Sequence, residues 1–160
     1  MNTYDRIFGA GPKGAVISIL LLVVAYGLEH IVALPAITAN HVVRYSIYGV
    51  FAFIGIAIII WSLKSLPPKE RGKNLVTTGA FKYFRHPLYA AFLSFFNVGF
   101  AVLMNNWIYL LWALLILPLW HLTIRREEAL MVREFGDDYV KYCEKTGRFF
   151  IKFGFFTKRD

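Results

Sequence analysis

Long apolar stretches alternate with short polar ones along the chain. Four of the apolar stretches reach or approach the roughly 20 residues that a helix needs to cross the hydrocarbon core of a bilayer: residues 15–34, 45–63, 88–104 and 107–124. The second of them contains no charged residue and lacks the polar stripe of a helix that has a solvent-facing side. The pattern predicts an all-α integral membrane protein with four transmembrane helices in a single membrane domain, residues 1–160.

The basic residues are distributed unevenly among the segments that join these stretches. Arg6 and Lys13 precede the first stretch, only Arg44 lies between the first and the second, and none lies between the third and the fourth. Six fall between the second and the third, and nine follow Ile124. Because loops rich in Lys and Arg stay on the cytoplasmic side of a membrane, we expect a multi-pass protein with both its N- and C-termini in the cytoplasm.

Composition agrees with a membrane location. Hydrophobic residues make up 58% of the chain and charged residues 18%, whereas soluble domains average ~45–50% and ~25%. The net charge of +8 suits the anionic cytoplasmic leaflet rather than nucleic acid, because the basic residues flank the apolar stretches. The one cysteine, Cys143, excludes an internal disulfide and a cysteine-rich metal site, so we expect no metal.

The segment after the last apolar stretch predicts a cytoplasmic amphipathic tail. It ends in aromatic residues set among Lys and Arg: Phe149, Phe150, Phe153, Phe155 and Phe156. Such a mixture suits a segment that lies at the level of the lipid headgroups. A disordered chain end is the alternative.

A first group of candidate functional residues lies at the entrance to the third apolar stretch. Pro87 is favoured in the first turn of a helix, which puts Arg85 and His86 at the mouth of that helix. Free backbone N–H groups there can bind an anion such as a carboxylate. The alternative is a simple helix start whose cations extend toward the headgroups.

A second group lies where the fourth apolar stretch ends. His121, Arg125 and Glu128 are spaced i, i+4 and i+7, so they share one helix face, and Glu127 lies beside it. Paired glutamates at a membrane exit are unfavourable unless they face water or a cation. The sequence therefore indicates either a binding site or an interfacial cluster of salt bridges.

Taken in order, these groups resemble a known family. The run from Leu75 to Tyr89, then Glu127-Glu128-Ala129-Leu130 and the pattern from Phe135 to Tyr142, is similar to the isoprenylcysteine carboxyl methyltransferase family. Membrane phospholipid methyltransferases share the broad pattern. The similarity covers about residues 74–151, the cofactor-site half of the chain.

The resemblance implies S-adenosylmethionine as cofactor and methyl transfer to a lipid or lipidated acceptor. It implies these cofactor-binding residues: Leu75, Val76, Gly79, Arg85, His86, Tyr89, Glu127 and Glu128. The residues expected to act on the acceptor are His121, Arg125 and Glu128. A carboxylate acceptor needs no base, whereas an amine would need a glutamate or His121 to take its proton.

Two positions depart from the family pattern. Thr123 stands where these enzymes usually place an arginine, and Phe81 stands where they often have tyrosine. We expect Arg125 to replace the missing guanidinium. Two alternatives stay open, a phospholipid amine N-methyltransferase and a non-catalytic membrane scaffold of the same fold.

Overall fold

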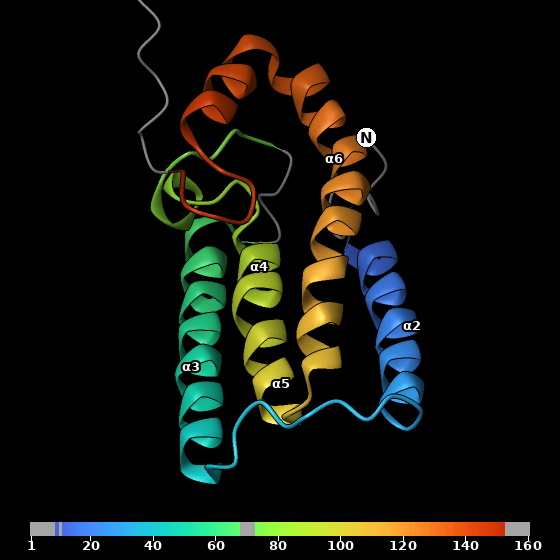
Figure 1. The fold of residues 1–160 in the computed structure, drawn as a ribbon. Helices are drawn as coiled ribbons and strands as arrows, with labels where there is room; N and C mark the ends of the chain where they lie inside the picture. Colours follow the sequence, from blue (N-terminus) through green and yellow to red (C-terminus); the bar gives the residue numbers. More distant parts are fainter. Residues whose placement is uncertain (1–8, 10, 68–72, 153–160) are drawn as a thin grey trace, which may run out of the picture.

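The computed structural model describes residue 9 and residues 11–67 and 73–152. It contains four long apolar helical rods (Figure 1). The rods are α2 (Gly11–Glu29), α3 (His41–Ser65), a third made of α4 (Pro87–Ala90), the π-helix η3 (Ala91–Phe96) and α5 (Asn97–Met104), and α6 (Trp107–Lys145). Each is long and apolar enough to cross a membrane, and the described residues form no strand. The predicted all-α, multi-pass membrane fold is confirmed. The predictions for Arg6, Phe153, Phe155 and Phe156 lie outside the described residues.

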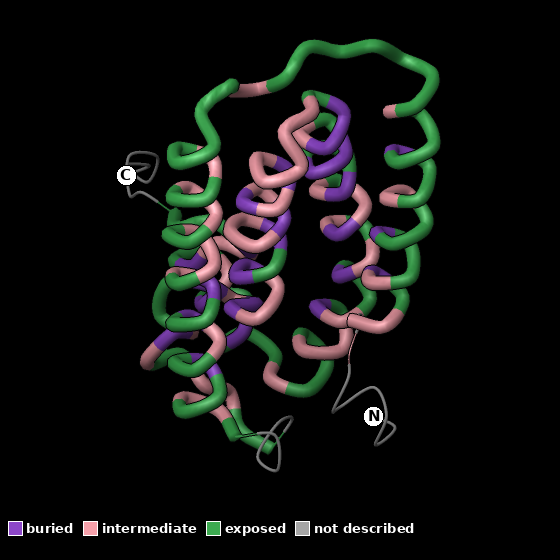
Figure 2. The backbone as a smooth tube through the Cα atoms, turned by 90° about the horizontal axis from the view of Figure 1, so that it is seen from below, coloured by how far each residue is buried: buried purple, intermediate pink, exposed green. Residues whose placement is uncertain are grey.

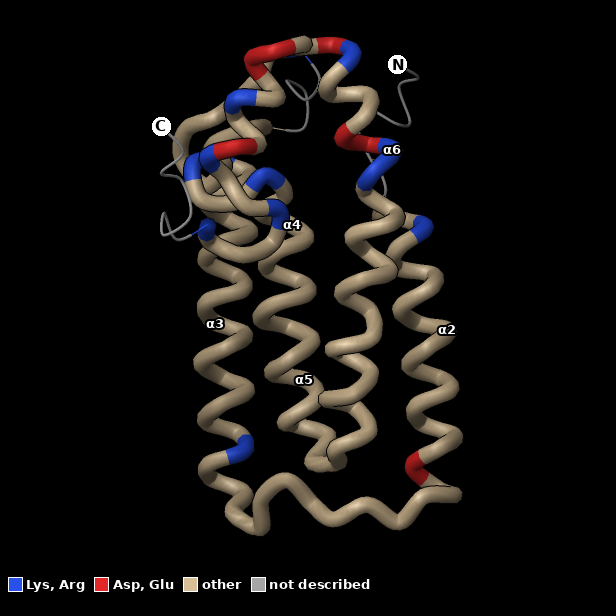
Figure 3. Tube along the Cα trace, turned by 45° about the horizontal axis from the view of Figure 1, so that its top comes forward, with Lys and Arg blue, Asp and Glu red and all other residues tan. Residues whose placement is uncertain are grey.

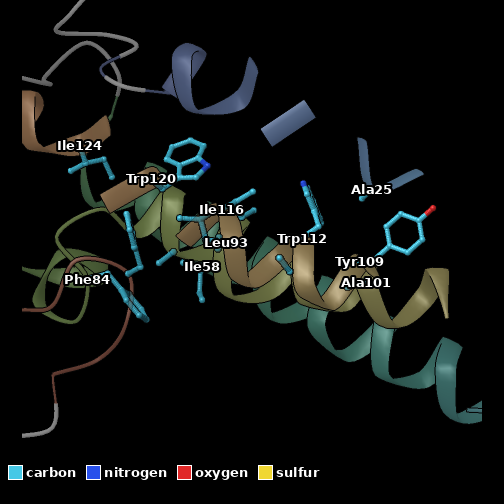
Figure 4. Packing of buried hydrophobic residues seen from close by; sticks show 14 of the residues in the cluster. Ala25, Ile58, Phe84, Leu93, Ala101, Tyr109, Trp112, Ile116, Trp120 and Ile124 are labelled. Carbon is cyan, nitrogen blue, oxygen red and sulfur yellow. The ribbon is translucent and has the colours of Figure 1, made fainter. Parts of the chain in front are cut away.

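The two central rods, α4–α5 and α6, carry most of the buried residues, while α2 and α3 flank them (Figure 2). On α6, Trp112, Ile116 and Trp120 recur every four residues and so share one buried face. This face packs into the core together with Leu93 of the third rod and Ile58 of α3 (Figure 4). The outer faces of α2 and α3 expose large apolar side chains, as expected for surfaces that contact lipid tails.

The first helix ends at Glu29, earlier than Leu34, where the sequence pattern placed the end of the first span. Pro35 disfavours a helical conformation only at Leu34, so it does not by itself explain an end at Glu29. The Tyr109 hydroxyl donates to Glu29 Oε2 at 2.5 Å, and Asn106 Nδ2 donates to Glu29 Oε1 at 3.4 Å. The end of α2 is therefore held against the start of α6.

The turn between the third and fourth spans is tight and consists of Asn105 and Asn106. Asn105 adopts the left-handed conformation (φ 58°) that ends α5. Asn106 then caps α6, its side-chain oxygen accepting the backbone N–H of Ile108 at 3.0 Å. This turn makes α4–α5 and α6 antiparallel neighbours, so the start of the third span and the exit of the fourth lie at the same end.

The helix α6 continues past its apolar part and changes direction at Gly136, whose backbone angles (φ 55°, ψ −135°) are non-helical. The part after Gly136 folds back over the end of the third rod (Figure 1). There the Tyr142 hydroxyl donates to the carbonyl of Phe81 at 2.6 Å. The segment beyond Lys145 is therefore returned to the helix bundle.

The segment that follows α6 docks on the residues that precede α4. Arg85 N–H donates to the carbonyl of Gly147 at 2.8 Å, and His86 N–H donates to that of Arg148 at 3.2 Å. Phe149 is 1% exposed. Although an amphipathic tail was predicted, this part of it, residues 146–149, is packed against the bundle.

Charged residues concentrate at this end of the bundle (Figure 3). At the opposite end, the described residues include only Glu29 and Arg44 as charged groups. The two groups of candidate functional residues therefore lie at the charged end of the helices.

Candidate functional site

One side of the site, formed by Arg85 and His86, comes from the start of the third rod. His86 is the residue before the first turn of α4, and Pro87 occupies that turn. The His86 side chain is 8% exposed and that of Arg85 is 12% exposed. The backbone N–H groups of both residues donate to carbonyls of the segment after α6. Their position is therefore fixed both by the start of α4 and by that segment.

Two carboxylates of α6 meet the side chains of Arg85 and His86. Glu128 Oε1 lies 3.3 Å from Arg85 Nη1 and 3.5 Å from His86 Nε2. Glu127 Oε1 lies 3.6 Å from His86 Nδ1, and the Tyr89 hydroxyl donates to Glu127 Oε2 at 3.4 Å. The structure thus brings together five of the predicted cofactor-binding residues from two separate motifs.

A second guanidinium joins the cluster from Arg148, which the sequence analysis did not single out. Arg148 Nε donates to Glu128 Oε2 at 2.9 Å, and Arg148 Nη2 donates to the same oxygen at 2.5 Å. Its Nη1 lies 3.1 Å from His121 Nδ1. In the sequence, Arg148 follows Gly147 within the predicted tail, and nothing else there indicates a role in the site.

Arg125, which was expected to replace the missing family arginine, does not contact the cluster. Arg125 is exposed, and it has no hydrogen bond or ion pair with any residue that the structure describes. Thr123 donates its hydroxyl to the carbonyl of Leu119 in its own helix at 2.8 Å. The second guanidinium of the cluster is therefore that of Arg148.

Aromatic rings line the polar cluster. The Tyr89 ring stacks on His86 at a centroid distance of 5.6 Å, and its centroid lies 4.9 Å from that of Trp120. Phe149 meets His121 edge-on at 4.8 Å. Charged groups thus lie beside apolar and aromatic surfaces, a setting that strengthens electrostatic interactions by excluding water.

Electrostatics keep the central carboxylate ionised. Glu128 lies one turn beyond the apolar span 107–124, at the charged end of the helices. Burial would raise the pKa of Glu128, but contacts with His86 and Arg148 and the charge of Arg85 outweigh it and lower the pKa to about 2. Burial, and then the charge of Glu128, raise the pKa of Tyr139 above its ordinary value, so this phenol stays protonated.

Three buried polar atoms at the centre of the cluster have no hydrogen-bond partner among the described residues. They are Arg85 Nε, His86 Nε2 and Glu128 Oε1. Glu128 Oε1 lies 3.5 Å from His86 Nε2 and 3.3 Å from Arg85 Nη1, so it has close polar contacts that are not hydrogen bonds. The grouping of the three atoms suits a ligand that carries both hydrogen-bond donors and acceptors.

The remaining predicted cofactor residues lie in the loop before α4. Gly79 has a positive φ of 60° and packs on α3, where a Cβ would lie 2.2 Å from Ser65 Oγ. Glycine is therefore required at this position, both by the positive φ and by the close approach of Ser65. Leu75 and Val76 are half-buried.

A cavity of about 280 Å³ lies deeper among the helices. Its lining is mostly apolar and includes Ser18, Leu22, Phe96 and Phe100. Ser18 also accepts a hydrogen bond from Trp120 Nε1 at 2.9 Å. Since Trp120 packs on Tyr89, a short chain of contacts links the cavity to the polar cluster.

Comparison with known proteins finds similarity over the middle of the chain. Residues 47–133 match the model of the isoprenylcysteine carboxyl methyltransferase (ICMT) family. The protein-S-isoprenylcysteine O-methyltransferase of Schizosaccharomyces pombe is 34% identical over 87 residues, which are 52% of this chain and 36% of that protein. The matched part thus spans about a third of the length of this relative. The family match includes both candidate motifs, but it ends before Gly136 and Arg148.

Proposed function

Because the chain belongs to the isoprenylcysteine carboxyl methyltransferase family, we propose that it transfers a methyl group from S-adenosylmethionine to the carboxylate of a lipidated acceptor. The observation that carries this proposal is the convergence of Arg85, His86, Glu127 and Glu128 beside the Tyr89 ring. This convergence favours a binding site over the non-catalytic scaffold, because three buried polar atoms within it make no hydrogen bond with the described residues.

The chemistry of these side chains fits S-adenosylmethionine. Arg85 and His86 would bind its carboxylate, and Glu127 and Glu128 would bind its amine and ribose hydroxyls. The electron-rich face of Tyr89 would stabilise its positive charge. The loop at Leu75, Val76 and Gly79 would complete the cofactor site. When bound, the cofactor supplies a methyl group on a sulfonium, which a carboxylate oxygen can take without any proton transfer, leaving a neutral thioether.

The acceptor would lie between the cofactor site and the helices. His121, on the Arg148 side of Glu128, is the residue that we propose to meet its carboxylate. Arg125, which is exposed, would act at the mouth of the site. The mostly apolar cavity bordered by Phe96 and Phe100 suits the hydrocarbon chain of a lipidated acceptor. The site needs mainly to align donor and acceptor in a dry environment, where proximity contributes most to the rate.

The proposed cofactor is tested by binding and by transfer together. We expect S-adenosylmethionine to bind the purified protein in detergent with a Kd on the order of 1 μM, and labelled methyl to appear on a prenylated cysteine with a free carboxylate. His86→Ala should weaken binding by about 1–3 kcal/mol, because it removes one of the two side chains proposed to bind the cofactor's carboxylate. His41→Ala, at the opposite end of the bundle, is the matched control. Equal affinity in the two variants would exclude His86 from the site.

The proposed orientation has both termini and the charged end of the helices in the cytoplasm. We expect a reporter inserted at Lys73 to be cytoplasmic and one inserted at Asn105 to be external, because basic loops are retained on the cytoplasmic side. Accessibility of each reporter in intact cells measures this. A cytoplasmic reporter at Asn105 would contradict the orientation.

A further inference from the structure

The contact between Arg148 and His121 determines which ring nitrogen carries the proton. An arginine guanidinium has five N–H donors, no acceptor, and stays protonated in proteins. Arg148 Nη1 lies 3.1 Å from His121 Nδ1, so Nδ1 must be the acceptor of this hydrogen bond. The imidazole that accepts it is neutral and carries its proton on Nε2.

We propose that Arg148 is a positioning residue that holds His121 as a neutral hydrogen-bond donor, and that this selects an anionic oxygen acceptor over an amine. This inference rests on the proposed function, because it concerns the acceptor side of the same site. His121 then offers Nε2–H to the acceptor and has no lone pair left with which to remove a proton.

Arg148 is anchored firmly enough to impose this tautomer. Its backbone carbonyl accepts a hydrogen bond from the N–H of His86 at 3.2 Å. Two of its guanidinium nitrogens donate hydrogen bonds to Glu128 Oε2. Its neighbour Phe149 is buried and packs edge-on against the His121 ring. The guanidinium and the imidazole are thus both fixed in place.

The other candidate bases are engaged as well. Glu128 is paired with Arg85 and Arg148, and an ion-paired carboxylate is a poor proton acceptor. Glu127 contacts His86 Nδ1 and the Tyr89 hydroxyl, on the other side of the His86 ring from Glu128. An amine acceptor, which must lose a proton, would find no available base in this cluster, whereas a carboxylate needs none.

Ring-nitrogen chemical shifts of His121 test the tautomer without any measurement of activity. In the protein with ¹⁵N-labelled histidine, assigned by comparison with His121→Gln, we expect a neutral ring with the proton on Nε2 at neutral pH. Arg148→Met removes the donor, so the Nδ1 signal should move toward a mixture of tautomers. An imidazolium, an Nδ1–H tautomer, or a spectrum unchanged by Arg148→Met would overturn the proposal.

Acceptor kinetics test the selectivity. His121→Gln keeps an N–H donor but cannot act as a base, so kcat with a prenylcysteine carboxylate should fall less than about tenfold, whereas loss of a general base costs roughly 10²–10⁴-fold. Arg148→Lys should raise the acceptor KM at least about tenfold, because one ammonium cannot bridge both Glu128 and His121. Arg126→Lys, an exposed site on the same helix as His121, should leave both constants unchanged.

Different results would contradict the acceptor selectivity and the methyl transfer itself. Efficient methylation of a phospholipid amine in preference to the carboxylate would overturn the selectivity. Absence of transfer to either acceptor by the wild-type protein would contradict the proposed function, while the nitrogen shifts would still decide whether Arg148 sets the tautomer of His121.

Discussion

Glu128→Gln should destabilise the protein by about 3–5 kcal/mol, the usual effect of removing one partner of a buried ion pair. Glu128 is 8% exposed and contacts the guanidinium groups of Arg85 and Arg148 and the imidazole of His86. Without its charge, the two guanidinium groups are left close together and uncompensated. Chemical unfolding in detergent measures the loss. The control is Glu134→Gln on the same helix, which is exposed and should change stability by no more than about 0.5 kcal/mol.

Acid titration gives an independent check of the same charge. The pKa of Glu128 is lowered in the folded protein, from an ordinary 4.5 to about 2. The carboxylate therefore stabilises the fold fully above pH 4.5, and this contribution is lost as the pH falls from 4.5 toward 2. Glu128→Gln should show a smaller loss of stability over this range. Parallel acid curves for the wild type and the variant would mean that the ion pairs do not stabilise the fold.

Gly136→Ala should destabilise the folded-back end of α6 by about 1–3 kcal/mol, the cost of holding a non-glycine residue in a backbone region that glycine alone adopts readily. Gly136 has φ 55° and ψ −135°, and a Cβ there would meet no atom within 4 Å. The cost is therefore one of backbone conformation and not of packing. Gly49→Ala is the matched control, since a Cβ at that helical glycine also meets nothing within 4 Å. It should instead stabilise α3 by roughly 0.5–1 kcal/mol.

The same variant should weaken the site, because the chain after Gly136 carries Arg148 to Glu128 and His121. We expect faster amide hydrogen exchange in residues 137–149 and weaker binding of S-adenosylmethionine, with exchange in α3 unchanged. If Gly136→Ala and Gly49→Ala have equal stability and equal exchange, then the fold-back does not depend on the conformation of this glycine.

The hydrophobic pattern alone determined the four apolar helices, because a helix must satisfy its own backbone hydrogen bonds in lipid and must be long enough to cross it. The order of the polar motifs along the chain indicated the methyltransferase family and the meeting of Arg85 and His86 with Glu127 and Glu128. That inference succeeded because a tight turn at Asn105 and Asn106 makes the third and fourth spans antiparallel, which brings the two motifs to the same end.

Only the tertiary structure decided where the chain goes after the last span. The end of α2 at Glu29 depends on contacts with Tyr109 and Asn106, which lie far away in sequence. The role of Arg148 depends on the change of direction at Gly136 and on the docking of residues 147 and 148 against Arg85 and His86. Local periodicity describes which face of a helix is apolar, but it carries no information about the direction in which a chain leaves a glycine kink. The spacing favoured Arg125 as the second guanidinium of the cluster, but Arg125 is exposed. The second guanidinium comes instead from Arg148 in the C-terminal segment, whose position the spacing could not predict.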